Sequence, residues 1–144
     1  MNLYKLHNNP ETLYGYEQRY KVPEFAYDIA VNRDGRSPEL EPAIMQNPRW
    51  AYRYAAVIIG DRFIEAEPYI AKDIKYAYQY ALNIIEGQFP EAEPLIMKDP
   101  NYAYQYARNI IKGRFIEAEP YIMKDPFWWD SYVTNIKGKY NNGI

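Results

Sequence analysis

Apolar positions recur along this chain with two periods, one inside each predicted helix and one between helices. Between residues 51 and 59, apolar side chains follow one another at intervals of three or four residues, which predicts an α-helix with one buried face. The same pattern returns at 77–85 and 103–111, so Ala51, Ala77 and Ala103 are 26 residues apart. A fixed period between about 20 and 50 residues is typical of a repeat array. The pattern therefore predicts a stack of similar units.

Each unit is predicted to contain a longer and a shorter helix. The longer helix begins with an Asn-Pro or Asp-Pro pair, in which the first side chain caps free N–H groups and the proline loses no bond. In the third repeat Asp73 keeps the cap without the proline. A glycine that accepts a positive φ is expected to end each longer helix. These glycines are Gly60, Gly87, Gly113 and Gly138.

The shorter helix is predicted to begin in the motif Glu-Ala-Glu-Pro. Its proline cannot lie inside a helix and is expected in the first turn of a helix of about five or six residues. These prolines are Pro68, Pro94 and Pro120. Pro38 and Pro90 stand four residues before the next proline, and a 3₁₀ turn is expected between the two.

One face of each longer helix is predicted to form the core. Alanines one turn apart let neighbouring backbones approach, and isoleucines fill the space behind them. The predicted core positions are Ala51, Tyr54, Ala55, Ile58, Ile59, Ala77, Tyr80, Ala81, Ile84, Ile85, Ala103, Tyr106, Ala107, Ile110 and Ile111, with Ile70, Ile96 and Ile122 of the shorter helices packed on them. At the margin of this face, Tyr52, Tyr78 and Tyr104 are expected to pack between repeats with their hydroxyls reaching water or a carbonyl.

The whole chain, 1–144, is predicted to be one domain: an all-α, right-handed solenoid of about five two-helix repeats. Residues 1–24 are expected to form an N-terminal cap, because an end repeat must not leave an apolar face in water. Residues 25–124 hold the repeats; the first is one residue short, near Arg33 and Asp34. Residues 125–144 are a degenerate repeat and C-terminal cap, in which Phe127, Trp128 and Trp129 are expected to cover the end of the stack.

The opposite face of the longer helices is the candidate binding surface. It combines an aromatic stripe with a polar, amide-rich stripe, and exposed aromatic rings beside arginine are typical of interaction hot spots. Two interpretations stay open: the rings are exposed to a partner, or each packs on the preceding glycine turn. The candidate partner-binding residues are Trp50, Arg53, Tyr76, Gln79, Asn83, Tyr102, Gln105 and Asn109.

The motif Glu-Ala-Glu-Pro also places paired carboxylates in register. Such pairs can act as acid and base or bind hard cations. A catalytic pair needs two different environments, however, and carboxylates at a helix start are already favoured by the helix dipole. Nearby cations are expected to screen this ladder: Arg36, Arg62, Arg114, Lys72, Lys98 and Lys124. The carboxylates are therefore interpreted as structural, with weak cation binding as the minor alternative.

Composition narrows the chemistry further. The 144 residues carry a formal net charge of −2, which gives no electrostatic reason to expect nucleic acid or a membrane surface. With no cysteine and one histidine, neither disulfides nor the usual zinc sites are expected. The sequence has no secretory signal, transmembrane run, phosphate loop or serine triad. A cytoplasmic, non-enzymatic protein without cofactor or metal is expected.

The pattern DPxxAYxYAxxIIKGRxxEAEPxIMK, which covers about residues 23–138, resembles a tandem repeat of uncharacterised bacteriophage and bacterial proteins. This resemblance implies an α-helical solenoid and a phage or bacterial origin, and it brings no catalytic residues. The rhythm of short helix and Asp-Pro helix is more distantly similar to leucine-rich variant and HEAT-like arrays. The first and fifth repeats depart from the pattern.

Solenoids offer extended surfaces that hold other macromolecules. The leading hypothesis is therefore a protein-binding module, which the resemblance extends to a phage-encoded inhibitor or adaptor acting on a host defence protein. The alternative is a structural, self-assembling repeat protein, so a monomer and a homo-oligomer are both open. Weak cation or nucleic-acid binding comes third, and the identity of the partner is not predicted.

Overall fold

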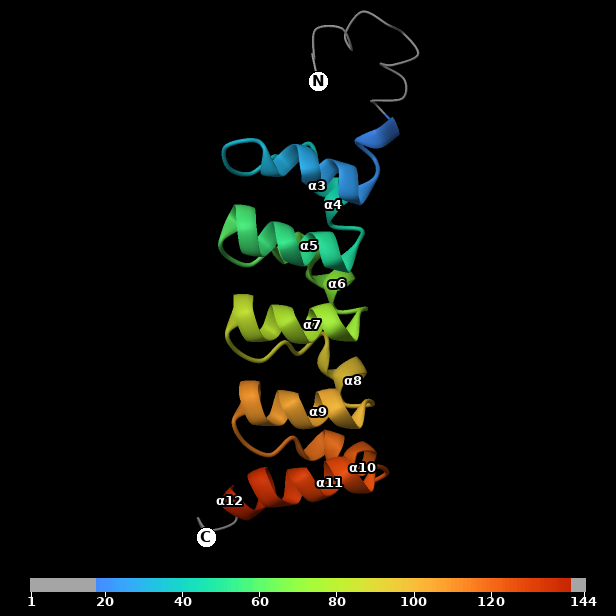
Figure 1. Ribbon diagram of the computed structural model, residues 1–144, viewed down its shortest axis with the longest axis vertical. Helices are drawn as coiled ribbons and strands as arrows, with labels where there is room; N and C mark the ends of the chain where they lie inside the picture. Colours follow the sequence, from blue (N-terminus) through green and yellow to red (C-terminus); the bar gives the residue numbers. More distant parts are fainter. Residues whose placement is uncertain (1–17, 141–144) are drawn as a thin grey trace, which may run out of the picture.

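The computed structural model describes residues 18–140, and every regular element in that span is a helix. The longer helices lie one above another along the long axis of the molecule, and the shorter helices fill the steps between them at one end (Figure 1). Helix pairs recur with the predicted period, which confirms an all-α repeat stack. Most of the predicted N-terminal cap, residues 1–17, lies outside the described residues.

The five longer helices are short in absolute terms. They are α3 (Pro23–Val31), α5 (Pro48–Tyr54), α7 (Ile74–Tyr80), α9 (Pro100–Tyr106) and α11 (Pro126–Tyr132). The shorter helices have four residues each: α4 (Glu41–Ile44), α6 (Glu67–Ile70), α8 (Glu93–Ile96) and α10 (Glu119–Ile122). Because helices of this length are unstable alone in water, packing between repeats must hold them.

The predicted helix starts are confirmed. The side chain of Asn47 accepts hydrogen bonds from the N–H groups of Arg49 and Trp50. Asp73 caps α7 in the same way, although the first residue of that helix is isoleucine instead of proline. Asp99 and Asp125 cap α9 and α11. The prolines of the shorter helices lie in the first turn, as predicted.

Each longer helix from α5 onward continues into a five-residue π-helical turn. These turns are η1 (Ala55–Ile59), η3 (Ala81–Ile85), η4 (Ala107–Ile111) and η6 (Val133–Lys137). A π turn holds one residue more per hydrogen-bonded ring than an α turn. The first repeat is one residue shorter, and α3 ends at Val31 without such a turn. The missing residue is therefore the one that widens the helix end in the later repeats.

Three of the four longer helices, each taken with its π turn, end within two residues of the predicted glycine, but of these four glycines only Gly60 has the expected positive φ. Gly60 has φ 69°. In the next two repeats the left-handed position falls one residue before the glycine, on Glu86 (φ 54°) and Lys112 (φ 55°). Gly138 has φ −65°, and the chain continues into α12 (Gly138–Tyr140). In the first three repeats with a π turn, the left-handed residue donates its N–H to the carbonyl five residues earlier, and Gly138 makes the same bond with a right-handed backbone.

The prediction of 3₁₀ turns is also corrected. They occur as η2 (Ile64–Ala66) and η5 (Ile116–Ala118), where isoleucine replaces the upstream proline. The segments after Pro38 and Pro90 form plain turns instead.

The core is a continuous column of small and aromatic side chains. In α5, α7 and α9, each taken with the π turn that follows it, two alanines are fully buried, and so is the tyrosine between them: Ala51, Tyr54, Ala55, Ala77, Tyr80, Ala81, Ala103, Tyr106 and Ala107. Ile70, Ile96 and Ile122 are buried as predicted. Ile58 and Ile59, with their counterparts, are only half-buried and pack against the edge of this core. The isoleucines were thus placed too deep by the prediction, because the π turn rotates them outward.

The last repeat ends the column with larger and more polar side chains. Trp129 takes the place of an interior alanine, and its ring stacks on Tyr132 at 5.7 Å. Tyr132 is fully buried, and the ammonium group of Lys137 lies 5.3 Å from the centre of the Trp129 ring. The aromatic cover predicted for this end is therefore supplied by Trp129.

Candidate partner-binding surface

The eight predicted binding residues lie on one face of three successive helices and their π turns. This surface, called here the outer face, consists of Trp50 and Arg53 on α5, Tyr76 and Gln79 on α7, Asn83 on η3, Tyr102 and Gln105 on α9, and Asn109 on η4. Equivalent residues stack because the helices follow one another with one period (Figure 1).

The aromatic rings of the outer face join neighbouring repeats. Trp50 is 9% exposed, and its ring lies 5.1 Å from that of Tyr27 in the preceding helix. Tyr76 lies 6.1 Å from Tyr52 in the same manner. Each ring thus packs on a tyrosine of the preceding repeat. This favours the interpretation that the rings are packed between repeats, although each contacts a tyrosine and not the glycine turn that was expected.

Tyr102 and Trp128 continue this stacking. Tyr102 lies 5.7 Å from Tyr78, and Trp128 lies 5.6 Å from Tyr104. Burial, followed by the charge of Asp99, raises the pKa of Tyr102 above its ordinary value. The rings at this surface are therefore part of the joint between repeats, and Tyr76, Tyr102 and Trp128 are half-buried there.

The asparagines of the outer face make a second joint. The side-chain amide of Asn83 donates to the hydroxyl of Tyr52 at 3.1 Å, and that of Asn109 donates to Tyr78 at 2.8 Å. Asn135 donates to Tyr104 at 3.2 Å. The marginal tyrosines thus accept an amide from the following repeat, a partner that the sequence did not indicate.

The polar side chains near the helix middle stay accessible. Arg53 is exposed, and Gln79 and Gln105 are half-exposed. Gln105 donates to the side chain of Asn101 at 2.6 Å, on its own helix. These side chains are the part of the predicted site that a partner can reach.

A groove of about 480 Å³ opens on this surface between α5 and α7. Three of its lining residues are predicted site residues, and three are additional: Arg53, Tyr76, Gln79, Arg49, Tyr52 and Lys75. The six lining residues include three cations and no carboxylate. The sequence prediction does not include Arg49 and Lys75. Each directly precedes a predicted aromatic site residue, and the two occupy equivalent positions in successive repeats.

Aromatic rings position the cations of the groove. The guanidinium groups of Arg49 and Arg53 lie 4.9 Å and 5.2 Å from the centre of the Trp50 ring. The ammonium group of Lys75 lies 5.5 Å from the Tyr76 ring. Among the residues that the structure describes, none of these three cations is in an ion pair. Their N–H donors therefore remain available.

The glutamate pairs belong to a different, structural network. In the pair nearest the middle of the stack, the Glu65 side chain is 61% exposed and the Glu67 side chain is 5% exposed. Glu67 accepts two hydrogen bonds from Arg62, both 2.7 Å, and one of 3.0 Å from the hydroxyl of Tyr80. That hydroxyl accepts the backbone N–H of Phe63 at 2.7 Å. Both oxygens of the buried carboxylate thus accept hydrogen bonds, and these bonds hold two repeats together.

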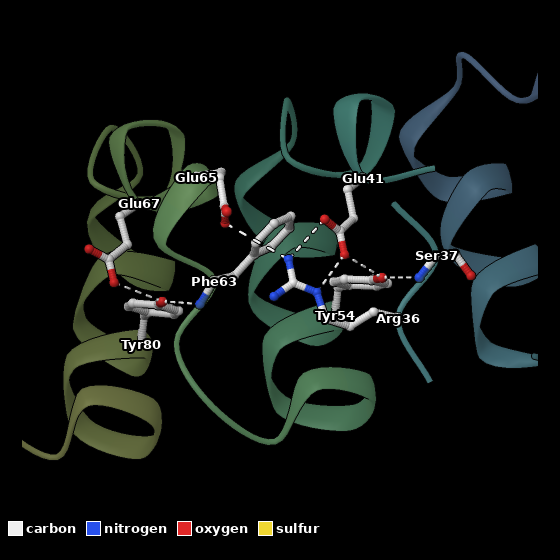
Figure 2. A network of polar contacts seen from close by, with 8 residues as sticks. All are labelled: Arg36, Ser37, Glu41, Tyr54, Phe63, Glu65, Glu67 and Tyr80. Atoms are coloured by element: carbon white, nitrogen blue, oxygen red, sulfur yellow. Dashed lines mark hydrogen bonds and ion pairs between the residues drawn. The ribbon is translucent and has the colours of Figure 1, made fainter. Parts of the chain in front are cut away.

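Figure 2 shows two successive copies of this network, the second of them without Arg62. In the first copy Tyr54 joins Glu41 to the N–H of Ser37, and Arg36 pairs with Glu41. Arg36 also reaches Glu65 of the next repeat at 3.9 Å. The predicted screening by arginines is confirmed for Arg36, Arg62 and Arg114.

Charge and burial shift the pKa values in this network in opposite directions. The hydrogen bonds from Arg36 and Arg114 hold the pKa values of Glu41 and Glu119 below the ordinary value. Burial raises the pKa of Tyr54 and of Tyr132 to about 12. These shifts favour charged Glu41 and Glu119 and neutral Tyr54 and Tyr132 at neutral pH.

In comparisons with known proteins, the chain matches no protein-family model, no curated protein and no solved structure. Within residues 18–140, no cluster of three or more His, Asp or Glu side chains is arranged to hold a metal ion. In the same span, no helix has the length and apolar character needed to cross a membrane.

Proposed function

We propose that this chain is a non-enzymatic protein-binding module that contacts its partner through the outer face of α5, α7 and α9. The observation that carries the proposal is the groove between α5 and α7, a cavity of about 480 Å³ lined by three cations that have no ion-pair partner within residues 18–140. The arginines that stabilise the fold are paired with glutamates, whereas the three cations of the groove are in no ion pair among the described residues. A surface with free donors at fixed positions is suited to recognition.

The rigidity of the stack supports the same proposal. Aromatic rings and asparagine–tyrosine hydrogen bonds join consecutive repeats beneath the surface. A partner that binds across several repeats therefore meets side chains that are already ordered, and little conformational entropy is lost on binding. Repeat stacks commonly use such extended faces to hold another macromolecule.

The resemblance of the repeat to phage and bacterial proteins extends the proposal to a biological setting. A phage-encoded inhibitor or adaptor needs no active site, only a surface that blocks or recruits a host protein. We place this chain in that class, with a host defence protein as its target in the cytoplasm. This extension rests on the resemblance, whereas the binding surface rests on the groove.

Affinity capture from the native host tests the proposal, with variants that spare the buried rings. The test variant is Arg53→Ser/Gln79→Ser/Gln105→Ser, which removes only accessible side chains. The matched control is Lys98→Ser/Gln46→Ser/Gln88→Ser, which removes one cation and two exposed glutamines elsewhere. A partner identified by mass spectrometry should be lost with the test variant and retained with the control. Equal capture by both variants would contradict the proposal.

Self-assembly is the alternative, and one observation favours it: Phe127 at the last repeat is 67% exposed. The same repeat carries exposed Asp130 and a lysine over its capping tryptophan, and charges at an end of a stack oppose further stacking. We therefore propose a monomer. Light scattering should give the mass of one chain at every concentration, whereas a mass that grows with concentration and falls in Phe127→Ser would establish self-assembly.

A further inference from the structure

We infer that the groove between α5 and α7 binds a short, carboxylate-rich segment of the partner protein. The inference rests on the proposed function and names the chemistry that the outer face recognises. Its basis is the set of three cations at one cavity, Arg49, Arg53 and Lys75, with Tyr52, Tyr76 and Gln79 as the remaining lining residues.

The two arginines are held ready for an anion. Arg49 and Arg53 are one helical turn apart, and both guanidinium groups lie over the Trp50 ring. Trp50 is itself fixed because its ring packs on Tyr27. Stacking on a ring leaves the in-plane N–H donors of a guanidinium free, and these donors match the two oxygens of a carboxylate. Two such groups and one ammonium can bind neighbouring acidic side chains.

The charge pattern along the stack limits the length of the anion. On α3, the positions equivalent to Arg49 and Arg53 hold Glu24 and Asp28, and both are exposed. On α9, the equivalent positions hold the neutral Asn101 and Gln105. A nucleic-acid strand that follows the helices would meet repulsion on one side of the groove and no cation on the other. A short acidic segment gains the attraction and avoids the repulsion.

The neutral side of the surface suits a polypeptide. Gln79 lies in the groove, and Gln105 follows it one repeat further. Side-chain amides both donate and accept, so they can pair with the backbone of an extended segment that leaves the groove toward α9. A phosphate backbone offers acceptors only and uses half of that capacity. The combined surface therefore fits an acidic peptide better than single-stranded nucleic acid.

The chain provides a matched control in a second basic cavity. It has a volume of about 240 Å³ and is lined by Arg108, Lys112, Gly113, Asn135, Ile136 and Lys139. This cavity also has three cations, but it lies at the π turns, and no aromatic ring is among its lining residues. Removing charge there changes the net charge equally without altering the groove.

The test measures the fluorescence anisotropy of a short labelled peptide of alternating Asp and Glu residues, with the full chain. Binding should saturate and weaken as salt rises toward about 0.15 M, because exposed charges are then screened. Arg49→Gln/Arg53→Gln should weaken it at least about tenfold, the equivalent of one lost charge-assisted hydrogen bond. Lys75→Gln should weaken it less, and Arg108→Gln/Lys112→Gln should leave it unchanged. Circular dichroism checks that each variant is folded.

Three outcomes would overturn the inference: no binding of the peptide to the parent protein, equal weakening by the two double variants, or tighter binding of single-stranded oligothymidylate at the same groove. The capture experiment separates this failure from that of the proposed function. If the outer-face triple variant loses its partner while the peptide fails to bind, the surface is correct and the acidic chemistry is wrong. If neither responds, both proposals are wrong.

Discussion

Single residues in the third repeat show how the Arg–Glu–Tyr network works. Three of its four copies contain arginine, at Arg36, Arg62 and Arg114, and the third copy has Gln88 at that position. Glu93 in that copy still accepts the hydroxyl of Tyr106 at 2.9 Å, and Tyr106 still accepts the N–H of Phe89. The tyrosine bridge thus forms without the arginine. The arginine adds an ion pair at the rim of the network.

We predict that Gln88→Arg stabilises the protein. The new side chain should pair with Glu93 as Arg62 pairs with Glu67. The Arg62 side chain is 44% exposed. Because solvent screens the arginine side of such a pair, the gain in the free energy of unfolding should be about 0.5–1 kcal/mol. Urea unfolding followed by circular dichroism measures it.

The reciprocal change, Arg62→Gln, is the control for this prediction. It should lower the stability by at least the same amount, because Glu67 is buried and loses two hydrogen bonds. A neutral or destabilising Gln88→Arg, together with a harmless Arg62→Gln, would show that the arginines do not contribute to stability.

Among the elements, the ends of the longer helices differ most from simple helix rules. In η1 the N–H of Gly60 bonds to the carbonyl of Ala55 at 2.8 Å, across five residues. In η1, η3 and η4 the residue that closes this wider ring is left-handed, whereas Gly138 closes the ring of η6 with φ −65° and the chain continues as a helix. Glu86 and Lys112 accept that conformation at a cost, and Gly60 accepts it freely.

We predict that Gly60→Ala destabilises the protein by about 1 kcal/mol, because a Cβ is disfavoured at positive φ even though no atom lies within 4 Å of it. Gly87→Ala is the matched control: its Cβ would meet Ile85 at an ordinary 3.9 Å, and its φ is not positive. That variant should stay within about 0.5 kcal/mol of the parent. Thermal and urea unfolding of both variants provide the measurement, and equal losses would contradict the explanation.

These elements also show what could be predicted from the sequence. Caps, first-turn prolines and the buried alanine face follow from local rules, so they were found by residue: Asn47, Asp73 and Ala51 are examples. The π turn was not, since one extra residue per turn leaves no distinct mark in hydrophobic spacing. The left-handed position was therefore predicted at Gly87 and Gly113, one residue after Glu86 and Lys112, where the structure has it. The handedness of the stack stays a prediction.

The candidate site could be predicted only in part, because it depends on contacts between repeats. The periodicity located the outer face, but whether Trp50 is exposed depends on Tyr27 in the preceding repeat. Similarly, the second glutamate of each pair looked equivalent to the first until Tyr80, 13 residues further along the chain, was seen to cover Glu67. Arg49 and Lys75 became part of the site only when α5 and α7 were seen to enclose a groove.

At the scale of the whole molecule, the repeated tyrosine hydrogen bonds should make the protein less stable at alkaline pH. Burial raises the pKa of Tyr54 and Tyr132 to about 12, and it raises the pKa values of Tyr80 and Tyr106 as well. In the unfolded chain these hydroxyls titrate near pH 10. The folded state therefore holds their protons more tightly, so the stabilisation is complete below about pH 10 and is lost as pH rises toward about 12.

We predict that the urea midpoint is level between about pH 6 and 9 and falls steeply above about pH 10, where the unfolded chain releases tyrosine protons that the folded chain retains. Tyr54→Phe/Tyr132→Phe should be less stable at neutral pH, because the N–H groups of Ser37 and Phe115 lose their acceptors. Its midpoint should nevertheless fall less steeply above about pH 10, since two of the titrating groups are gone. Tyr69→Phe, which changes an exposed tyrosine, is the control and should keep the parent slope. If the double variant and the parent lose stability with the same slope, the alkaline transition arises elsewhere, and the bridges hold the repeats together without setting their pH limit.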